Sequence, residues 1–192
     1  MKDISEATPQ PELRTERLVL RRFRAGDVDD VLTYSRDEEW SRYLRREVPF
    51  PYSRQDAEAN VMRRMLAGGD LNFAIDYGGT VIGSISLRVE HEELTAEIGY
   101  GIGREHWGKG FMPEAVRTVI AYGFRAMQLA KIFAPVDVRN TRSQRVLETC
   151  GFVREGVLRA HEIGRDGQRV DYAYYGLLQG EWGETGSSEG ER

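Results

Sequence analysis

The stretch Ile102–Ala115, IGREHWGKGFMPEA, decides the fold prediction, because it joins an expected strand to an expected helix through a glycine-containing loop. Gly108 and Gly110 have no Cβ, so the loop backbone can adopt left-handed dihedral angles and approach a ligand closely. Pro113 suits the first position of a helix, where a missing N–H costs nothing. Met112 would then be the N-cap, and its side chain offers no acceptor to the first N–H groups.

A helix that begins without a side-chain cap is a candidate anion site. Its free N–H groups and its dipole both favour negative charge, and Lys109 adds a positive charge beside them. The stretch lacks the three spaced glycines of a dinucleotide fingerprint and the Gly-Lys-Ser/Thr of a Walker loop. From the loop alone, a phosphate site and a plain strand–helix turn with solvated N–H groups both remain open.

Strands and helices alternate on either side of this loop. Strands are predicted at 17–23, 71–76, 80–89, 95–102, 132–138, 152–160 and 170–178, and helices at 27–36, 53–67, 113–127 and 141–150. The order β-α-α-β-β-β-α-β-α-β-β predicts an α/β (α+β) domain with a mixed, mostly antiparallel central sheet flanked by helices. Asp27 and Ser53 are expected near helix starts, and Gly151 is an expected left-handed residue after the last helix.

The composition indicates one globular domain. The chain has 192 residues, of which 40% are hydrophobic, enough for a single sizeable core. We expect this domain at residues 13–179, between a disordered polar tail at 1–12 and a disordered acidic tail at 180–192. A single cysteine allows no internal disulfide, and the first residues lack an apolar signal segment, so a cytoplasmic protein is expected.

Charge and spacing exclude several partner classes. Of the net charge of −4, residues 1–12 carry −2 and residues 180–192 carry −3, so about +1 remains for the domain. This balance supplies no clustered basic face for nucleic acid. No apolar run approaches the roughly 20 residues of a membrane helix. The scattered His91, His106 and His161, with one cysteine, form no metal-ligand spacing, so no metal is expected.

Four segments, in this order, carry a family resemblance: TERLVLRRF (15–23), IGYGIGREHWGKGFMPEA (98–115), RNTRSQRVLETCGFVREGVLR (139–159) and DYAYYGLL (171–178). Together they resemble the GNAT superfamily of acyl-CoA N-acyltransferases, and within it the RimJ/RimL-type ribosomal-protein-alanine acetyltransferases. The resemblance implies a GNAT-like fold. It also implies direct transfer of acetyl from acetyl-CoA to an amine in a ternary complex.

The resemblance further implies where acetyl-CoA binds. The family's loop Gln/Arg-x-x-Gly-x-Gly/Ala aligns with residues 107–112, where tryptophan replaces Gln/Arg and methionine replaces Gly/Ala. Strand 95–102, ending at Ile102, would splay from strand 132–138, and the pantetheine arm would lie in the gap like an added strand. The pyrophosphate would be held by the backbone amides of Trp107, Gly108, Lys109, Gly110, Phe111 and Met112.

Asn140 and Ser143 match the family's Asn-x-x-Ala/Ser at a helix start. The match implies contacts to the pantetheine for Asn140 and to the thioester region for Ser143. From the residues alone, Asn140 or Thr141 could only cap the helix, and Ser143 could be a surface serine. Many members place a tyrosine in this helix to protonate the leaving thiolate, but the position holds Leu147 here, which leaves Ser143 or a water as the donor.

An amine must be neutral to attack a thioester, so a base or a proton-conducting water is needed. Glu97, early in the strand 95–102, is the first candidate, and Glu92 and Glu93 are alternatives. A register shift of one residue would turn Glu97 to the opposite face as a plain exposed carboxylate. With Glu90, these residues could also attract a cationic amine. A backbone N–H of the strand could stabilise the oxyanion.

The acceptor stays open between classes. The RimJ/RimL resemblance favours a protein N-terminal α-amine. A small-molecule amine (an aminoglycoside, a polyamine or an amino-acid-like compound) fits the same chemistry, and the missing tyrosine leaves a non-catalytic acyl-CoA sensor open. Four aromatic residues lie where this superfamily shapes its acceptor site, and they could line a substrate pocket or simply pack the helices: Trp40, Tyr43, Phe50 and Tyr52. A homodimer is compatible with the resemblance, and Cys150 at a helix C-terminus is expected to be buried and inert.

Overall fold

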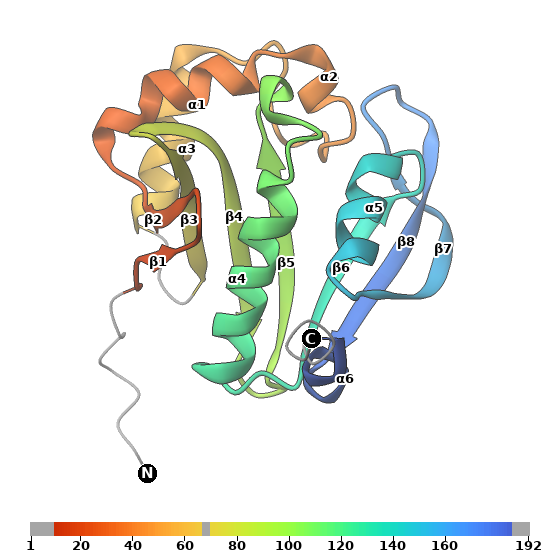
Figure 1. Cartoon of the computed structure of the whole chain (residues 1–192). Coiled ribbons are helices and arrows are strands. Elements are labelled where there is room, and N and C mark those ends of the chain that lie inside the picture. Colours follow the sequence, from red (N-terminus) through yellow and green to blue (C-terminus); the bar gives the residue numbers. More distant parts are fainter. Residues whose placement is uncertain (1–9, 67–69, 186–192) are drawn as a thin grey trace.

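The structure, a computed structural model, describes residues 10–66 and 70–185. Its sheet has eight strands in the order β1-β2-β3-β4-β5-β6-β8-β7, and only the β5–β6 pair is parallel (Figure 1). This confirms the mixed, mostly antiparallel prediction. The strands are Leu13–Arg14 (β1), Val19–Arg22 (β2), Leu71–Tyr77 (β3), Thr80–Glu90 (β4), Thr95–Ile102 (β5), Lys131–Asp137 (β6), Val153–Ile163 (β7) and Arg169–Leu178 (β8).

The predicted element order is recovered, with β1, α2 and α6 added to it. The predicted end of the second long helix at residue 67 lies outside the described residues. The helices are Val28–Ser35 (α1), Glu38–Ser41 (α2), Arg54–Leu66 (α3), Phe111–Arg125 (α4), Thr141–Thr149 (α5) and Gln179–Thr185 (α6).

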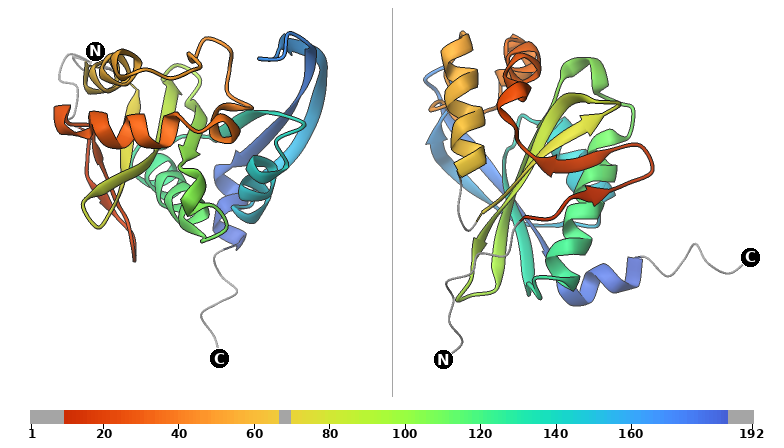
Figure 2. Two further views of the ribbon diagram at one scale, coloured as in Figure 1. Left: turned by 90° about the horizontal axis from the view of Figure 1, so that it is seen from above. Right: turned by 90° about the vertical axis from the view of Figure 1, so that its left-hand side faces the viewer.

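Two apolar clusters hold the layers together. Helices α1 and α3 lie on one side of the sheet and α4 on the other (Figure 2). The α4 side is the larger cluster, in which Val116, Val119 and Ile120 are fully buried against strand residues such as Ile98. Burial of this helical stripe against the sheet fixes where α4 begins, and so where the loop before it lies.

Helices α1 and α5 begin and end within one residue of their predicted bounds, and α3 begins within one residue, whereas α4 begins and ends two residues earlier than predicted. Asp27 is at the N-cap position of α1, but its side chain does not cap the helix; it pairs with the buried Arg21 at 2.9 Å. Ser53 and Asp56 exchange hydrogen bonds at the start of α3, as a capping box does. Gly151 is left-handed, with φ 89°, as expected after α5.

The C-terminal segment differs from its prediction. A disordered tail was expected from residue 180, whereas residues 179–185 form α6, because the ring of Trp182 packs 5.7 Å from that of Phe124. Arg125 also lies over the Trp182 ring, 4.8 Å from its centre. Residues 1–9 and 186–192, the rest of the two predicted tails, lie outside the described residues. In the described part, no helix is long and apolar enough to cross a bilayer.

Candidate active site

The parallel pair β5–β6 opens into a gap halfway along β5. The two strands are paired only from Thr95 to Glu97, opposite Lys131 to Phe133. Beyond Glu97 the strands diverge (Figure 1), so the second half of β5 lacks a strand on that side in the described chain. This is the predicted splay, and it leaves backbone groups of an internal strand available to a ligand.

The loop at the end of β5 delivers free backbone N–H groups to this gap. Gly108 and Gly110 have φ values of 73° and 79°, conformations that favour glycine. Gly110 is the N-cap of α4, and no side chain caps the helix. The expectation that Met112 is the N-cap was wrong: the left-handed Gly110 lets the helix begin at Phe111, and Pro113 is its third residue, within the first turn.

The N–H groups of Gly108, Lys109 and Gly110 have no acceptor within residues 10–66 and 70–185. Together with the positive end of the α4 dipole, they form an arrangement that can bind an anion such as a phosphate. The sequence predicted this property of the loop, even though the helix start was displaced by two residues.

Arg17 holds the loop from behind. It donates to the Lys109 carbonyl oxygen at 3.0 Å and to the Glu114 carboxylate at 2.7 Å, and its guanidinium lies 4.4 Å from the centre of the Phe111 ring. Burial alone would raise the pKa of Glu114, but hydrogen bonds from Thr15 and Arg17 bring it below its ordinary value. The loop is therefore fixed in place before any ligand arrives.

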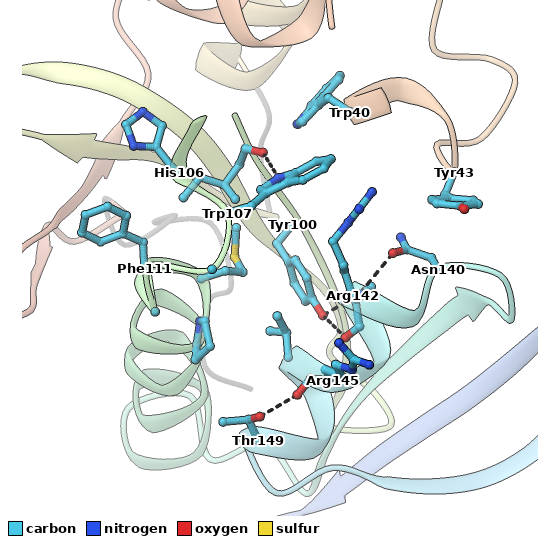
Figure 3. A pocket seen from close by; sticks show the side chains of 18 of the residues that line it. Trp40, Tyr43, Tyr100, His106, Trp107, Phe111, Asn140, Arg142, Arg145 and Thr149 are labelled. Atoms are coloured by element: carbon cyan, nitrogen blue, oxygen red, sulfur yellow. Dashed lines mark hydrogen bonds between the residues drawn. The ribbon is translucent and has the colours of Figure 1, made fainter. Parts of the chain in front are cut away.

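A cavity of about 530 Å³ lies between the start of α4, the second half of β5 and α5 (Figure 3). This volume falls within the roughly 300–1,000 Å³ typical of small-molecule sites. Neither Lys109 nor Glu97 is among the described residues that line it. The other predicted site residues all line the cavity: Ile102, Trp107, Gly108, Gly110, Phe111, Met112, Asn140 and Ser143.

A series of side-chain contacts crosses one end of the cavity. The indole N–H of Trp107 donates to the Ile102 carbonyl oxygen at 2.9 Å, and Arg142 lies 3.8 Å from the centre of the Trp107 ring. Arg142 also donates to Glu39 of α2 at 2.9 Å. This hydrogen bond is the main reason why the pKa of Glu39 lies below its ordinary value. These contacts join the loop, α5 and α2 around the cavity.

The start of α5 is capped, unlike that of α4. The Asn140 side-chain oxygen accepts the Ser143 N–H at 3.1 Å, so the alternative that Asn140 caps the helix is confirmed. Asn140 also lines the cavity. The Ser143 hydroxyl is not a plain surface group, because its oxygen lies 3.1 Å from the Tyr100 phenol oxygen.

The predicted base lies beside the cavity and not in its wall. Glu97 points to the sheet face opposite that of the buried Ile98. There it pairs at 3.6 Å with Arg45 of the segment after α2, and at 3.4 Å with Arg88, its register partner on β4. Its pair with Phe133 is the last one before the strands diverge. The alternatives Glu92 and Glu93 lie in the exposed β4–β5 turn, just before β5 begins and away from the cavity at its second half.

A second cleft, of about 780 Å³, adjoins the first and shares Glu39 and Tyr43 with it. Phe50 also lines it, as the acceptor-region prediction suggests, whereas Tyr52 is buried in the α1–α3 cluster. Three of its carboxylates are already paired with arginines: Asp37 with Arg104 at 3.6 Å, Glu39 with Arg42 at 3.1 Å and Asp166 with Arg139 at 2.8 Å.

The other positions considered for catalysis, Leu147 and Cys150, do not line the cavity. Leu147 is fully buried in the α4-side cluster, so α5 directs no hydroxyl into the cavity from that position. Cys150 is buried, its thiol lies 3.6 Å from the Pro113 carbonyl oxygen, and burial raises its pKa to about 11. No group of three or more potential metal ligands occurs among the described residues.

Sequence reasoning missed Tyr100, Arg142 and Glu39. Tyr100 could have been found from strand alternation, because it shares the cavity-side face of β5 with Ile98 and Ile102. Arg142 and Glu39 depend on a contact between segments 103 residues apart, which no local pattern reveals.

The chain is similar to known proteins over most of its length. The family described as acetyltransferase (GNAT) domain matches residues 17–153. An uncharacterized N-acetyltransferase, p20 of Bacillus licheniformis, is 37% identical over 88% of this chain and 97% of its own. A ribosomal-protein-serine acetyltransferase of Escherichia coli is 29% identical over 66% of this chain and 69% of its own. The solved structure of spermidine N-acetyltransferase from Vibrio cholerae, in complex with CoA and spermine, is 25% identical, with a TM-score of 0.73, over 86% of this chain and 98% of its own.

Proposed function

This chain belongs to the GNAT family of acetyltransferases, and we propose that it transfers acetyl to the α-amine at a protein N-terminus. The acyl donor of this family is acetyl-CoA. One observation carries the binding of acetyl-CoA, on which the proposal depends: the uncapped start of α4 and the unpaired half of β5 open onto the same cavity. An anion site and an available strand edge, side by side, match the two ends of a pantetheine diphosphate.

Backbone groups supply most of the donor site in this proposal. The amides of residues 107–112 hold the pyrophosphate, with Lys109 adding charge from outside the cavity wall. The unpaired half of β5 receives the pantetheine arm, although the Ile102 carbonyl already accepts from Trp107. The Asn140 side-chain oxygen is used by its cap, so its amide N–H groups are the part left for the pantetheine.

In this proposal Glu97 takes a proton from the amine, and Ser143 lies beside the leaving group. The amine enters from the second cleft, on the sheet face to which Glu97 points, and loses its proton to Glu97 through a water. The neutral nitrogen attacks the thioester carbon, and a free N–H of β5 stabilises the oxyanion. The C–S bond then breaks, and the Ser143 hydroxyl lies near the departing sulfur.

The charge of the second cleft favours a peptide acceptor over a polyamine. A polycation binds best where carboxylates are unpaired. Of the four carboxylates that line this cleft, Asp37, Glu39 and Asp166 each face an arginine, and Glu38 alone has no ion pair among the described residues. Relatives act on both classes by their names, ribosomal protein and spermidine. A small-molecule amine is therefore the second candidate. We further propose a cytoplasmic protein, which fits its single cysteine; the homodimer stays a prediction.

The test is amine-dependent release of CoA thiol from acetyl-CoA. The panel holds peptides that begin with Ala, Ser or Met, together with polyamines and aminoglycosides. We expect peptides to stimulate release most and Gly110→Trp to abolish it. Stimulation by polyamines alone would replace the acceptor assignment. Binding of acetyl-CoA without turnover on any amine would support the sensor alternative.

Removal of the base gives a separate test. Glu97→Gln keeps the size of the side chain but cannot accept a proton, so kcat should fall about 100-fold at neutral pH. The matched control is Glu93→Gln in the β4–β5 turn, for which we expect kcat within twofold of the unaltered protein. Equal rates for the two variants would remove Glu97 from the mechanism.

A further inference from the structure

Two hydroxyl groups meet inside the cavity, one from β5 and one from α5. The Tyr100 phenol oxygen lies 3.1 Å from the Ser143 hydroxyl oxygen and 3.1 Å from the Ser143 carbonyl oxygen (Figure 3). Both residues line the cavity. The contact therefore lies where the proposed donor site ends.

The number of protons limits how these two contacts can be made. A phenol carries one proton, and a carbonyl oxygen can only accept. In the first arrangement, the Tyr100 phenol donates its hydrogen bond to the Ser143 carbonyl oxygen, and the Ser143 hydroxyl must donate to the phenol oxygen. In the second arrangement, the phenol donates to the Ser143 hydroxyl oxygen, and the serine proton is free to donate to a third group in the cavity.

We propose that Tyr100 is a positioning residue for Ser143, and that the pair passes from the first arrangement to the second during acetyl transfer. The inference rests on the proposed function. As the C–S bond breaks, its electron pair goes to sulfur; Ser143 then donates a hydrogen bond to sulfur and receives one from Tyr100. Neither hydroxyl loses its proton. The ammonium gives its first proton to Glu97 through water before the attack; the nitrogen loses its second proton as the C–S bond breaks, and water relays that proton to the sulfur.

The surroundings of Tyr100 suit a hydrogen-bond donor better than an acid. Burial raises the pKa of Tyr100 above its ordinary value, which disfavours the phenolate. Donation of a hydrogen bond needs no phenolate. Because α5 carries the buried Leu147 and no tyrosine, a phenol reaches this region from the neighbouring strand.

Tyr175 offers a matched control. It is 1% exposed, and its phenol bonds α5 at Gln144 (3.2 Å) and Glu148 (3.0 Å). It is not among the described residues that line the cavity. Tyr100→Phe and Tyr175→Phe each remove one hydroxyl that is bonded to α5, so similar decreases in thermal stability are expected from both.

The test is a pH titration of bound CoA, followed by the ultraviolet absorbance of its thiolate. Loss of one hydrogen bond to the sulfur should raise the pKa of the bound thiol in Tyr100→Phe by about half to one pH unit, a roughly three- to tenfold loss of thiolate stabilisation. Ser143→Ala should give the same increase, and the double variant no more. Tyr175→Phe should match the unaltered protein. With a responsive amine, kcat should fall by a similar factor in Tyr100→Phe, while the KM for acetyl-CoA stays within about twofold.

The outcomes separate this inference from the proposed function. An unchanged thiol pKa in Tyr100→Phe, or an equal increase in Tyr175→Phe, would overturn the positioning role and leave acetyl transfer standing. Additive effects of Tyr100→Phe and Ser143→Ala would also overturn it, because the two groups would then act separately. Failure of CoA to bind the unaltered protein would overturn both.

Discussion

Helices α4 and α5 begin at the wall of the same cavity, and they begin differently. The N-cap of α4 is Gly110, in a left-handed conformation and without a side chain to accept hydrogen bonds. The N-cap of α5 is Asn140, whose side-chain oxygen accepts the Ser143 N–H at 3.1 Å. The first helix start leaves its donors free for an anion. At the second helix start the Ser143 N–H is already bonded to Asn140, and this bond fixes Ser143 beside Tyr100.

The contrast shows how one cavity divides two tasks. A free helix start binds charge, and a capped one supplies a rigid position for a side chain. If this division is correct, changes at Gly110 should alter the affinity for CoA more than stability. Changes at Asn140 should alter stability more than affinity.

The largest effect is expected from Gly110→Trp. A Cβ at Gly110 would lie 3.3 Å from the Arg17 guanidinium that holds the loop, so the indole would disrupt that contact and displace the N–H groups of the loop. CoA affinity should then fall at least about 100-fold, since hydrogen bonds to a charged group are worth roughly 1.5–3 kcal/mol each. The matched control is Gly78→Trp in the β3–β4 turn, which is also left-handed, with φ 63°, and faces open space. Both variants carry a similar backbone strain of about 1–2 kcal/mol. Calorimetric titration of CoA should separate them, and a similar loss of affinity in Gly78→Trp would remove the site-specific explanation.

A smaller change at the same position sharpens the comparison. Gly110→Asp and Gly110→Asn differ only in charge, and both residues tolerate left-handed dihedral angles. A Cβ at this position would lie 3.3 Å from Arg17, so the aspartate would place a negative charge beside that guanidinium at the start of α4 and repel a diphosphate. We expect CoA to bind about tenfold more weakly to the Asp variant than to the Asn variant at low salt, and the difference to shrink at high salt. Equal affinities would mean that no anion binds at this helix start.

At α5 the effect should appear in stability. Asn140→Ala removes the cap and should lower the free energy of unfolding by about 1 kcal/mol. Asn140→Ser keeps a capping oxygen but loses the amide N–H groups, so it should retain most of the stability. Any loss of CoA affinity in Asn140→Ser then measures the proposed pantetheine contact alone. Denaturant unfolding of both variants measures the change in stability, and titration with CoA measures the change in affinity. A larger loss of affinity than in Gly110→Asp would reverse the comparison.

The smallest effect concerns Cys150, which lies just after α5 and bonds to Pro113 in the first turn of α4. Burial raises the pKa of its thiol from an ordinary 9.0 to about 11. At pH 8, alkylation should therefore be about 100-fold slower in the folded protein than after unfolding. The raised pKa stabilises the fold below pH 9, and this contribution is lost as the pH rises from 9 toward 11. Rapid alkylation of the native protein would show that the junction of the two helices opens.

The sequence predicted this contrast only in part. The strand Thr95–Ile102 was predicted at the bounds that the structure has, because its glycines and alternating apolar residues leave little choice. The start of α4 was displaced by two residues, since a left-handed glycine N-cap is set by the backbone and leaves no side-chain signal. The short elements β1, α2 and α6 escaped because none is long enough to show a period.

The contacts that organise the site come from tertiary structure. Tyr100 and Ser143 are 43 residues apart, and Glu39 and Arg142 are 103 apart. No local pattern pairs them. Glu97 was placed on the correct strand, but its pairing with Arg88 depends on the β4–β5 register, and its pairing with Arg45 depends on how the segment after α2 folds over the sheet.

The central claim is that the uncapped start of α4 binds the diphosphate of acetyl-CoA. Calorimetric titration of the unaltered protein with CoA and with pantetheine, which lacks the diphosphate and adenosine, tests it most directly, with Gly110→Asp titrated in parallel. The account predicts that CoA binds at least about 100-fold more tightly than pantetheine, and that the difference largely disappears in Gly110→Asp. Equal affinities for the two ligands in the unaltered protein would contradict it.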